Sequence, residues 1–264
     1  MLFRSGGPNH DHGLHSFTPG PDGRLYAAVG NAGPHLVTDR DGWRLRSGSI
    51  YVGGGEFTAD NKPGLISDDG RVWTGGLVIS VRPDGGGMRV HAHNFRNNYE
   101  VSLDAFGNLF LSDNDDDGNR GCRTLWAMEG GNYGYFSEDG SRSWRSDRRP
   151  GQPVPSAHWH ADDPGVSPPG TINGAGGPTG VAVYEGRMLA DWIGGAVLNA
   201  DAGAGVVYAH QPRAEGAGVV LEPGWLIRGR RGDEEQSARW FRPSDVCVAP
   251  DGSVLVADWY DPGV

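Results

Sequence analysis

The aspartates of residues 113–118 form a dense acidic group in this chain of 264 residues. Four carboxylates fall within five residues, at Asp113, Asp115, Asp116 and Asp117, and Gly118 follows them. Carboxylates this close repel one another unless a cation compensates them. Hard Ca²⁺ prefers several oxygen ligands, and a glycine allows the sharp turn of a calcium loop. We therefore expect a compensating protein cation or a calcium ion here, with a solvated acidic loop as the alternative.

Histidines are the second group that could carry chemistry. His10, His12 and His15 stand close together near the N-terminus, and His158 and His160 form a His-x-His pair. Because histidine titrates near pH 6.5, its neutral ring can accept a proton at neutral pH, and it can also bind a metal. For the first group a general base, a metal site and a structural role stay open. For the pair we expect hydrogen-bonded loop histidines rather than a metal site.

Short β-hairpins are the elements that must position these residues. Each strong copy has a turn containing glycine followed by an apolar strand, and the glycine supplies the positive φ that the turn needs. The three strong copies are residues 20–30, 104–113 and 249–258, and weaker copies are residues 68–73 and 82–85. No segment shows a sustained 3.6-residue apolar period. Repeated hairpins without helical periodicity are typical of an all-β fold, the β-propeller.

One long excursion interrupts the hairpins. Residues 137–179 are rich in Gly, Pro, Ser, Asp and Arg, and several aromatic residues within them favour an ordered loop over a linker. Strand-like runs resume after residue 180, and we see no domain boundary. We therefore predict one propeller domain over residues 1–264, incomplete, with about four or five blades and long loops. Both ends of the chain stop abruptly, which predicts a fragment of a longer protein.

Composition excludes several classes of function. Gly and Pro, 45 and 18 residues, accompany recurring aromatic and apolar runs, which indicates turn-rich β structure rather than disorder. The net charge of −10 and the lack of a basic stripe argue against nucleic acid as a partner. Cys122 and Cys247 belong to no metal or haem motif, and we expect two buried thiols. No apolar run is long enough to predict a transmembrane helix.

Several blocks, in this order, resemble those of the soluble quinoprotein sugar dehydrogenases of the glucose/sorbosone type. The similarity is greatest to a branch of membrane-bound dehydrogenase domains from planctomycete-type bacteria, whose members often carry a separate haem-binding module. No single block is very specific, whereas their order and spacing are. The blocks are His12-Gly13 with Phe17 and residues 20–26, residues 95–97 with the hairpin 104–111, residues 130–134, residues 177–184, and residues 240–246 with 250–252.

The resemblance implies a six-bladed propeller that binds pyrroloquinoline quinone (PQQ) on its axis, with Ca²⁺ polarising the quinone. His12 falls at the general base that takes the proton of a sugar hydroxyl. Arg96 falls at the arginine beside the quinone oxygens, and Asn97 at its neighbour. These residue types suit the chemistry, because neutral histidine can accept a proton and arginine stabilises negative charge that develops on a reduced quinone.

The remaining implied roles concern the metal, the cofactor and the partners. Asp115 and Asp116 fall where backbone carbonyls hold the calcium, which would act as a Lewis acid. Arg242 falls at an arginine that packs on the cofactor, although it could instead pair with Asp245. The resemblance further implies a sugar or alcohol as substrate, a haem-containing electron acceptor, and export to the periplasm.

The chain departs from the family pattern at three places. Gly203 stands where the family has a lysine that contacts the cofactor, and Ser244 replaces the second arginine of the last block. Residues 98–100 replace the family's Pro-Gln-Gly. Two cationic contacts to a cofactor with three carboxylates are therefore missing.

Three functions stay open on the sequence. The first is a quinoprotein dehydrogenase, which predicts that His12, Arg96 and residues 113–117 meet at one mouth of the propeller. The second is a calcium-dependent lactonase-like hydrolase, which predicts that the aspartate side chains face the axis. The third is a non-catalytic propeller that binds carbohydrate or protein, which predicts that His12 is buried in the core away from Arg96.

Overall fold

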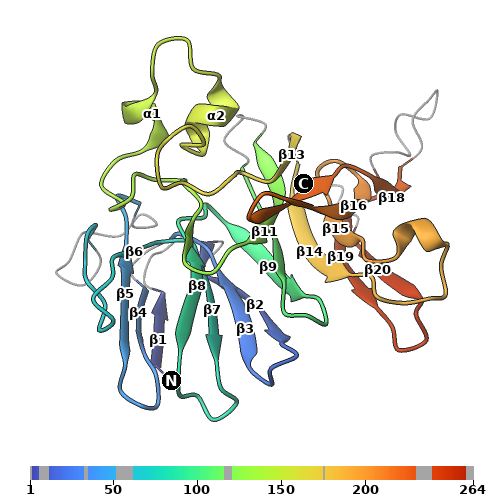
Figure 1. Cartoon of the computed structure of the whole chain (residues 1–264), viewed down its shortest axis with the longest axis horizontal. Coiled ribbons are helices and arrows are strands. Elements are labelled where there is room, and N and C mark those ends of the chain that lie inside the picture. The colour runs from blue at the N-terminus through green and yellow to red at the C-terminus, as the bar shows by residue number, and fades with distance from the viewer. Residues whose placement is uncertain are drawn as a thin grey trace. The chain divides into compact units, whose positions relative to one another are not determined.

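The computed structural model describes residues 2–5, 12–32, 35–51, 62–115, 121–174, 176–229 and 240–259, with residues 2–5 described as a strand only. His10 and Asp116 therefore lie outside the described residues. The chain forms two compact units (Figure 1). We call Met1–Asn98 with Ala127–Pro169 the first unit, and Tyr99–Trp126 with Gly170–Val264 the second unit. The single domain predicted from the sequence stays a prediction.

The first unit contains two sheets. β6 pairs with β5 in parallel and β12 pairs with β8 in parallel, and the other neighbours are antiparallel. The first sheet has the order β1-β4-β5-β6, with β1 Leu2–Ser5, β4 His35–Thr38, β5 Arg44–Gly48 and β6 Trp73–Thr74. The second has the order β12-β8-β7-β3-β2, with β2 Leu14–Pro19, β3 Leu25–Val29, β7 Leu77–Val81, β8 Arg89–His93 and β12 Gly131–Asn132 (Figure 1).

The two sheets of the first unit share one apolar core. Val37 and Leu45 of the first sheet pack with Val29, Leu77 and Ile79 of the second, and all five side chains are buried. All five residues of β7 are buried, so both faces of this central strand are covered. A sheet that is covered on both faces is what a propeller blade between two neighbours requires.

The second unit contains two further sheets and a two-stranded pair. One sheet has the order β13-β11-β10-β9, with β9 Asn98–Leu103, β10 Leu109–Asp113, β11 Cys122–Ala127 and β13 Thr171–Gly174. The other has the order β14-β15-β16-β17, with β18 also paired to β16; these are β14 Pro178–Val183, β15 Val197–Asp201, β16 Val206–Glu215, β17 Gly218–Glu222 and β18 Trp225–Arg228. The pair is β19 Pro243–Val248 with β20 Val254–Asp258. Apolar residues of β14, β15, β16 and β19 meet in one buried cluster.

The predicted hairpins are confirmed. The turn at residues 20–23 joins β2 to β3, the turn at 104–107 joins β9 to β10, and the turn at 249–252 joins β19 to β20. Gly23, Gly107 and Gly252 have φ of 77°, 87° and 86°, the left-handed conformation expected of them. The all-β class is confirmed too, and the four larger sheets with the two-stranded pair match the four to five blades predicted for an incomplete propeller.

The described part of the excursion at residues 137–179 carries more structure than its composition indicates. Its part in the first unit contains two short helices, α1 Trp144–Asp147 and α2 Val154–His158. Outside this excursion, the second unit contains one short 3₁₀ helix among its described residues, η2 Asp191–Ile193. His160 donates from Nδ1 to the carbonyl of Gly134 at 2.6 Å and is buried, which is the hydrogen-bonded loop histidine expected.

Candidate functional site

Three segments of the first unit meet at the ends of their strands. Residues 12–15 enter β2, residues 30–32 leave β3, and residues 94–97 leave β8. The N–H of Asn31 donates to the carbonyl of Arg96 at 3.1 Å, and the N–H of Ala32 donates to the carbonyl of His12 at 3.1 Å. The segment with Asn31 therefore ties the segment of His12 to the segment of Arg96.

Side chains of these segments form a polar cluster, which we call the His12–Arg96 cluster and which comprises His12, His15, Asn31, Arg96 and Asn97. His12 Nδ1 lies 2.7 Å from the side-chain oxygen of Asn31, and His15 Nε2 lies 2.7 Å from the side-chain oxygen of Asn97. An amide oxygen only accepts, so each of these ring nitrogens donates. When its ring is neutral, His12 therefore carries its lone pair on Nε2, and His15 carries it on Nδ1.

Burial fixes the amides and the arginine of the cluster. Asn31 is 1% exposed, and Arg96 and Asn97 are each 8% exposed, whereas His12 is half-buried. A buried guanidinium keeps its charge, because arginine does not lose its proton in proteins. The cluster thus combines one permanent positive charge with a histidine that solvent can reach.

Two glycines allow the segments to approach this closely. A Cβ on Gly30 would lie 2.5 Å from the side-chain oxygen of Asn97 and 2.6 Å from the carbonyl oxygen of His12. Gly76 has φ of 82°, and a Cβ there would overlap the carbonyl of Phe95. A side chain at Gly30 would push the segment of His12 away from Asn97, and a side chain at Gly76 would displace Phe95, which precedes Arg96.

Asn94 holds the segment before Arg96 in an uncommon backbone conformation. Its φ is 67°, a region that asparagine tolerates better than most residues. Its Nδ2 donates to Asn132 Oδ1 and to the carbonyl of Phe136, both at 2.8 Å, and its Oδ1 accepts from the N–H of Phe136 at 2.8 Å. These bonds fix the turn that leads from β8 to Arg96.

His35 is a buried histidine beside the cluster, which the sequence does not single out. Its Nε2 donates to the carbonyl of Gly30 at 2.8 Å, so it holds the strand end from which Asn31 projects. Burial lowers the pKa of His35 to about 4, although the bond to Gly30 opposes this shift. At neutral pH His35 is therefore an uncharged structural residue.

The acidic segment lies in the second unit, and a protein cation compensates its first carboxylate. Asp113 Oδ2 accepts from Arg123 Nη2 at 2.8 Å and from Arg123 Nε at 3.1 Å, and both side chains are fully buried. This pair confirms the expectation of a compensating cation for Asp113. The carboxylate of Asp113 is therefore committed to Arg123 rather than set toward an axial metal.

Asp115 is buried beside the thiol of Cys122. The N–H of Asp115 lies 3.2 Å from Cys122 Sγ, and the carbonyl of Asp115 lies 3.4 Å from the same sulfur. Burial raises the pKa of the Cys122 thiol to about 12, so it stays protonated and can donate to this carbonyl. The roles of Asp115 and Asp116 in holding calcium stay predictions. Among the described residues, no three His, Cys, Asp or Glu side chains are placed to hold a metal ion.

Cys247 differs from the expectation of two buried thiols. Cys122 is buried as predicted, whereas Cys247 is exposed on β19, and neither forms a disulfide. Alternate residues of a strand point to opposite faces, and Val246 and Val248 take the more covered face of β19. The side chain of Cys247 therefore lies on the other, solvent-facing side.

Arg242 lies in the second unit and contacts the loop where the family lysine is missing. Its Nη1 donates to the carbonyl of Ala202 at 2.8 Å and to the carbonyl of Gly203 at 3.3 Å, and its N–H donates to Asp258 at 2.7 Å. Asp245, which was the alternative partner of Arg242, hydrogen-bonds with Glu100 instead. The cofactor role of Arg242 stays a prediction.

The structure thus brings together three of the predicted site residues, His12, Arg96 and Asn97. Asp115 and Arg242 belong to the other unit and have local partners there. Sequence reasoning missed Asn31, whose side chain orients His12. An asparagine directly after the glycine that ends an apolar strand is the one sequence feature that could have pointed to it.

Solved sugar dehydrogenases share this fold. The match to the PQQ-bound aldose sugar dehydrogenase of Streptomyces coelicolor has a TM-score of 0.51 at 18% identity and covers 92% of this chain and 55% of that one. The match to a Thermus thermophilus protein described as an oxidoreductase (glucose dehydrogenase) has a TM-score of 0.53 at 18% identity and covers 95% of this chain and 62% of that one. The match to a further glucose dehydrogenase has a TM-score of 0.50 at 17% identity and covers 93% of this chain and 79% of that one. The chain therefore spans little more than half the length of the first two proteins.

These likenesses establish a β-propeller of the type found in quinoprotein sugar dehydrogenases. The chain belongs to the family DUF7133, described as a domain of unknown function, whose family model matches residues 2–263. No curated protein shows significant sequence similarity to it. No helix in the described part of the chain is long and apolar enough to cross a membrane.

Proposed function

We propose that this chain is the propeller part of a quinoprotein dehydrogenase that oxidises a sugar or another alcohol, with PQQ as its cofactor. The observation that supports this most strongly is the linkage of His12 to Arg96 through Asn31. A dehydrogenase of this kind needs a base at the hydroxyl and a positive charge at the electron acceptor. Asn31 holds one residue of each type.

His12 is the residue to which we assign proton removal. Its Nδ1 donates to Asn31, which fixes the ring and places the lone pair of the neutral form on Nε2. The half-buried ring can be reached by a substrate hydroxyl. Nε2 would take the proton of that hydroxyl while the carbon loses hydride.

Arg96 and Asn97 are the residues to which we assign contact with the cofactor. PQQ, when bound, supplies an acceptor for the hydride. Its carboxylates and quinone oxygens require hydrogen-bond donors and positive charge, and the buried guanidinium of Arg96 suits them. The donor set of the cluster therefore fits the quinone.

Calcium fits the described residues less well than the quinone does. Asp113 is paired with Arg123, and the carbonyl of Asp115 accepts from the thiol of Cys122. Neither group is arranged as part of an oxygen cage. We therefore assign no step to calcium and treat it as a variable of the experiment.

A non-catalytic propeller that binds carbohydrate or protein is the second candidate. Gly203 in place of the family lysine favours it, since Arg242 directs its guanidinium to the loop carbonyls rather than away from them. The half-buried position of His12 beside the segment of Arg96 counts against it, because this candidate predicted a core histidine. Export and a haem-containing electron acceptor remain part of the first proposal only.

Titration with PQQ decides between the candidates. The purified protein, extended to its natural ends, is titrated with and without Ca²⁺ while the quinone absorbance is followed, and turnover is then measured on a sugar panel. We expect binding at micromolar concentrations, about tenfold weaker or worse in Arg96→Ala. His12→Ala should keep most binding and lose turnover. The exposed arginine variant Arg89→Ala is the matched control and should bind normally.

The outcome that contradicts the dehydrogenase is absence of quinone binding even at millimolar Ca²⁺. Circular dichroism of each variant separates loss of a contact from loss of the fold. Binding without turnover on any sugar or alcohol would favour the non-catalytic candidate.

A further inference from the structure

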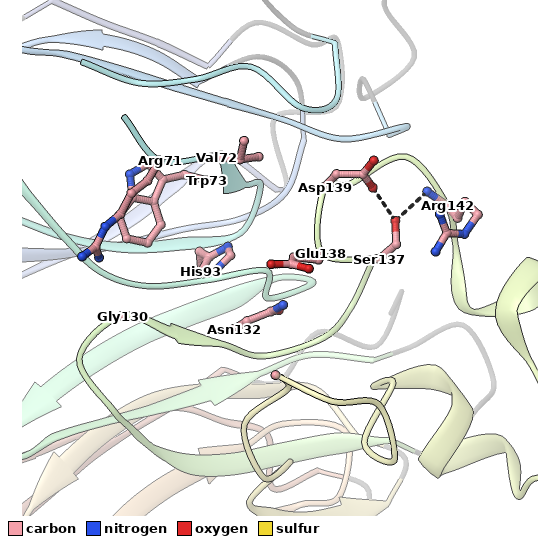
Figure 2. Close-up of a pocket in the computed structure, with 11 residues that line it drawn as sticks. Arg71, Val72, Trp73, His93, Gly130, Asn132, Ser137, Glu138, Asp139 and Arg142 are labelled. Carbon is pink, nitrogen blue, oxygen red and sulfur yellow. Dashed lines mark hydrogen bonds between the residues drawn. The ribbon is translucent and has the colours of Figure 1, made fainter. Parts of the chain in front are cut away.

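The first unit contains a cavity of about 660 Å³ that lies outside the His12–Arg96 cluster. Figure 2 shows the side chains that line it, which come from the segment around Trp73, from His93 at the end of β8, and from residues 130–142. Small-molecule sites in proteins span about 300 to 1,000 Å³, so the cavity has the volume for a small ligand. Neither the family match nor the proposed dehydrogenase activity gives it a role.

His93 contributes a fixed hydrogen-bond donor to this cavity. Its Nδ1 accepts from the backbone N–H of Thr74 at 3.2 Å, and its ring packs edge-on against Trp73 with centroids 5.1 Å apart. Burial lowers the pKa of His93 to about 4, so the ring is neutral at neutral pH. A neutral ring that accepts at Nδ1 must carry its proton on Nε2. His93 therefore offers an N–H and no charge.

Asn132 contributes a second donor. Its Oδ1 accepts from Asn94 Nδ2 at 2.8 Å and from the N–H of Gly134 at 3.0 Å, which commits the oxygen side of the amide. The NH₂ group then lies on the cavity side, and Figure 2 shows it directed toward Glu138. The orientation of this donor is fixed by the same bonds that shape the chain before Arg96.

Glu138 contributes the acceptor. Figure 2 draws its side chain to the right of His93 and above Asn132, and its carbonyl accepts from Thr74 Oγ1 at 2.7 Å, which anchors the residue. Its carboxylate forms no ion pair with any residue that the structure describes. The neighbouring Asp139 is partly committed, because its Oδ1 accepts from Ser137 and Ser141 at 2.7 to 3.0 Å, whereas its Oδ2 bonds to no other described residue.

Arg71 completes the set of polar groups. Its guanidinium lies 5.6 Å from the centroid of the Trp73 ring and pairs with no carboxylate among the described residues. Arg142, the other arginine of the cavity, is committed to Asp147 at 2.7 Å. The polar groups available to a ligand are therefore the carboxylate of Glu138, Oδ2 of Asp139, the guanidinium of Arg71 and two neutral N–H donors.

We propose that this cavity binds a neutral saccharide unit. A hydroxyl both donates and accepts, so adjacent hydroxyls on a sugar ring can donate to Glu138 and accept from Asn132, His93 and Arg71. An anion drawn to Arg71 would also meet the carboxylate of Glu138, and a cation drawn to Glu138 would also meet the guanidinium of Arg71, so neither sign of charge is favoured. A neutral polyol can hydrogen-bond to all four groups and places no further charge beside the exposed carboxylate of Glu138 or the exposed guanidinium of Arg71. The proposal is independent of the quinone, because none of these groups belongs to the His12–Arg96 cluster.

Calorimetric titration of the whole protein without quinone or calcium tests the proposal. The probes are glucose, galactose, mannose, xylose, cellobiose and maltose at up to about 50 mM, enough to detect millimolar Kd values. We expect at least one to bind. Glu138→Gln should weaken that binding about tenfold, because hydrogen bonds to charged groups are the stronger ones, and Arg71→Ala should weaken it about three- to tenfold.

Matched controls keep the test specific. Glu222→Gln and Arg89→Ala each remove an exposed charge outside the cavity and should change the Kd by less than about twofold. The proposal is overturned if no sugar of the panel binds, or if the two cavity variants bind as the controls do. Inorganic phosphate and glucuronate are titrated in parallel, and tighter binding of either anion than of every neutral sugar also overturns it. Loss of quinone binding with sugar binding intact would contradict the proposed dehydrogenase alone.

Discussion

His12 donates its Nδ1 proton to the side-chain oxygen of Asn31 at 2.7 Å. The same asparagine donates its backbone N–H to the carbonyl of Arg96 at 3.1 Å. One buried residue therefore sets both the tautomer of the proposed base and the position of the proposed cofactor arginine. The titration of His12 therefore responds to a charge placed at position 31.

Asn31→Asp is the first prediction. A carboxylate beside Nδ1 favours the protonated ring, so the pKa of His12 should rise by about one unit or more. Two-dimensional NMR of the histidine ring protons across a pH series measures it directly. The variant should also lower the stability of the fold, because position 31 is buried.

Asn97→Asp is the control for that experiment, since Asn97 accepts from His15 rather than from His12. It should raise the pKa of His15 and change that of His12 much less. A His12 pKa that is the same in Asn31→Asp and in the parent protein would mean that the hydrogen bond is not formed in solution.

Gly76→Ala is the second prediction. Its Cβ would overlap the carbonyl of Phe95, and alanine is also disfavoured at a φ of 82°. We expect a loss of about 3 kcal/mol in the free energy of unfolding, measured by urea denaturation. Gly23→Ala has a similar φ of 77° but open space around it, so it should cost only about 1 kcal/mol. Equal losses of unfolding free energy in the two variants would show that Gly76 is needed only for its positive φ and not for its close approach to Phe95.

Local turn chemistry explains why the hairpins were predictable. Gly23, Gly107 and Gly252 each lie in a polar turn and precede an apolar run, and this information lies within ten residues of sequence. The sequence predicted that a cation would compensate Asp113, because crowded carboxylates require one, but it did not predict that Arg123 would supply it.

Long-range pairing and short length explain what the sequence did not show. β13 pairs with β11 across nearly fifty residues, and its Thr-Ile-Asn-Gly sequence has no strong strand pattern. α1 and α2 have four and five residues, too few to show a helical period. Asn31 and Asn132 act through partners on other segments, so their roles depend on the fold rather than on neighbouring residues.

Arg123→Met is the third prediction. The Asp113–Arg123 pair is fully buried, and removing the arginine leaves a carboxylate without its counter-charge. Losing one partner of such a pair costs about 3 to 5 kcal/mol of folding free energy. Urea denaturation measures the loss, and the double variant Asp113→Leu with Arg123→Met should recover a large part of it. Arg213→Ala, which breaks exposed pairs with Glu215 and Glu222, should cost less than about 1 kcal/mol.

Glu100 gives the fourth prediction, which concerns pH. Burial is the largest cause that raises its pKa to about 7; the N–H of Val181 opposes the shift, and the adjacent carboxyl of Asp245 adds to it. The folded chain therefore binds this proton more tightly than the unfolded chain, where glutamate titrates near its ordinary value of 4.5. The stabilisation that the protonated group provides is fully present below about pH 4.5 and is lost as the pH rises to about 7.

Glu100→Gln removes this titration while it keeps an acceptor for the Val181 N–H. The parent protein should lose about 3 kcal/mol more stability than the variant between pH 4.5 and 8, because one pKa unit corresponds to about 1.4 kcal/mol. Urea denaturation at several pH values compares the two proteins. Glu222→Gln, at an exposed position on β17, should follow the parent at every pH. Parallel pH curves for the parent and Glu100→Gln would show that folding does not raise the pKa of Glu100.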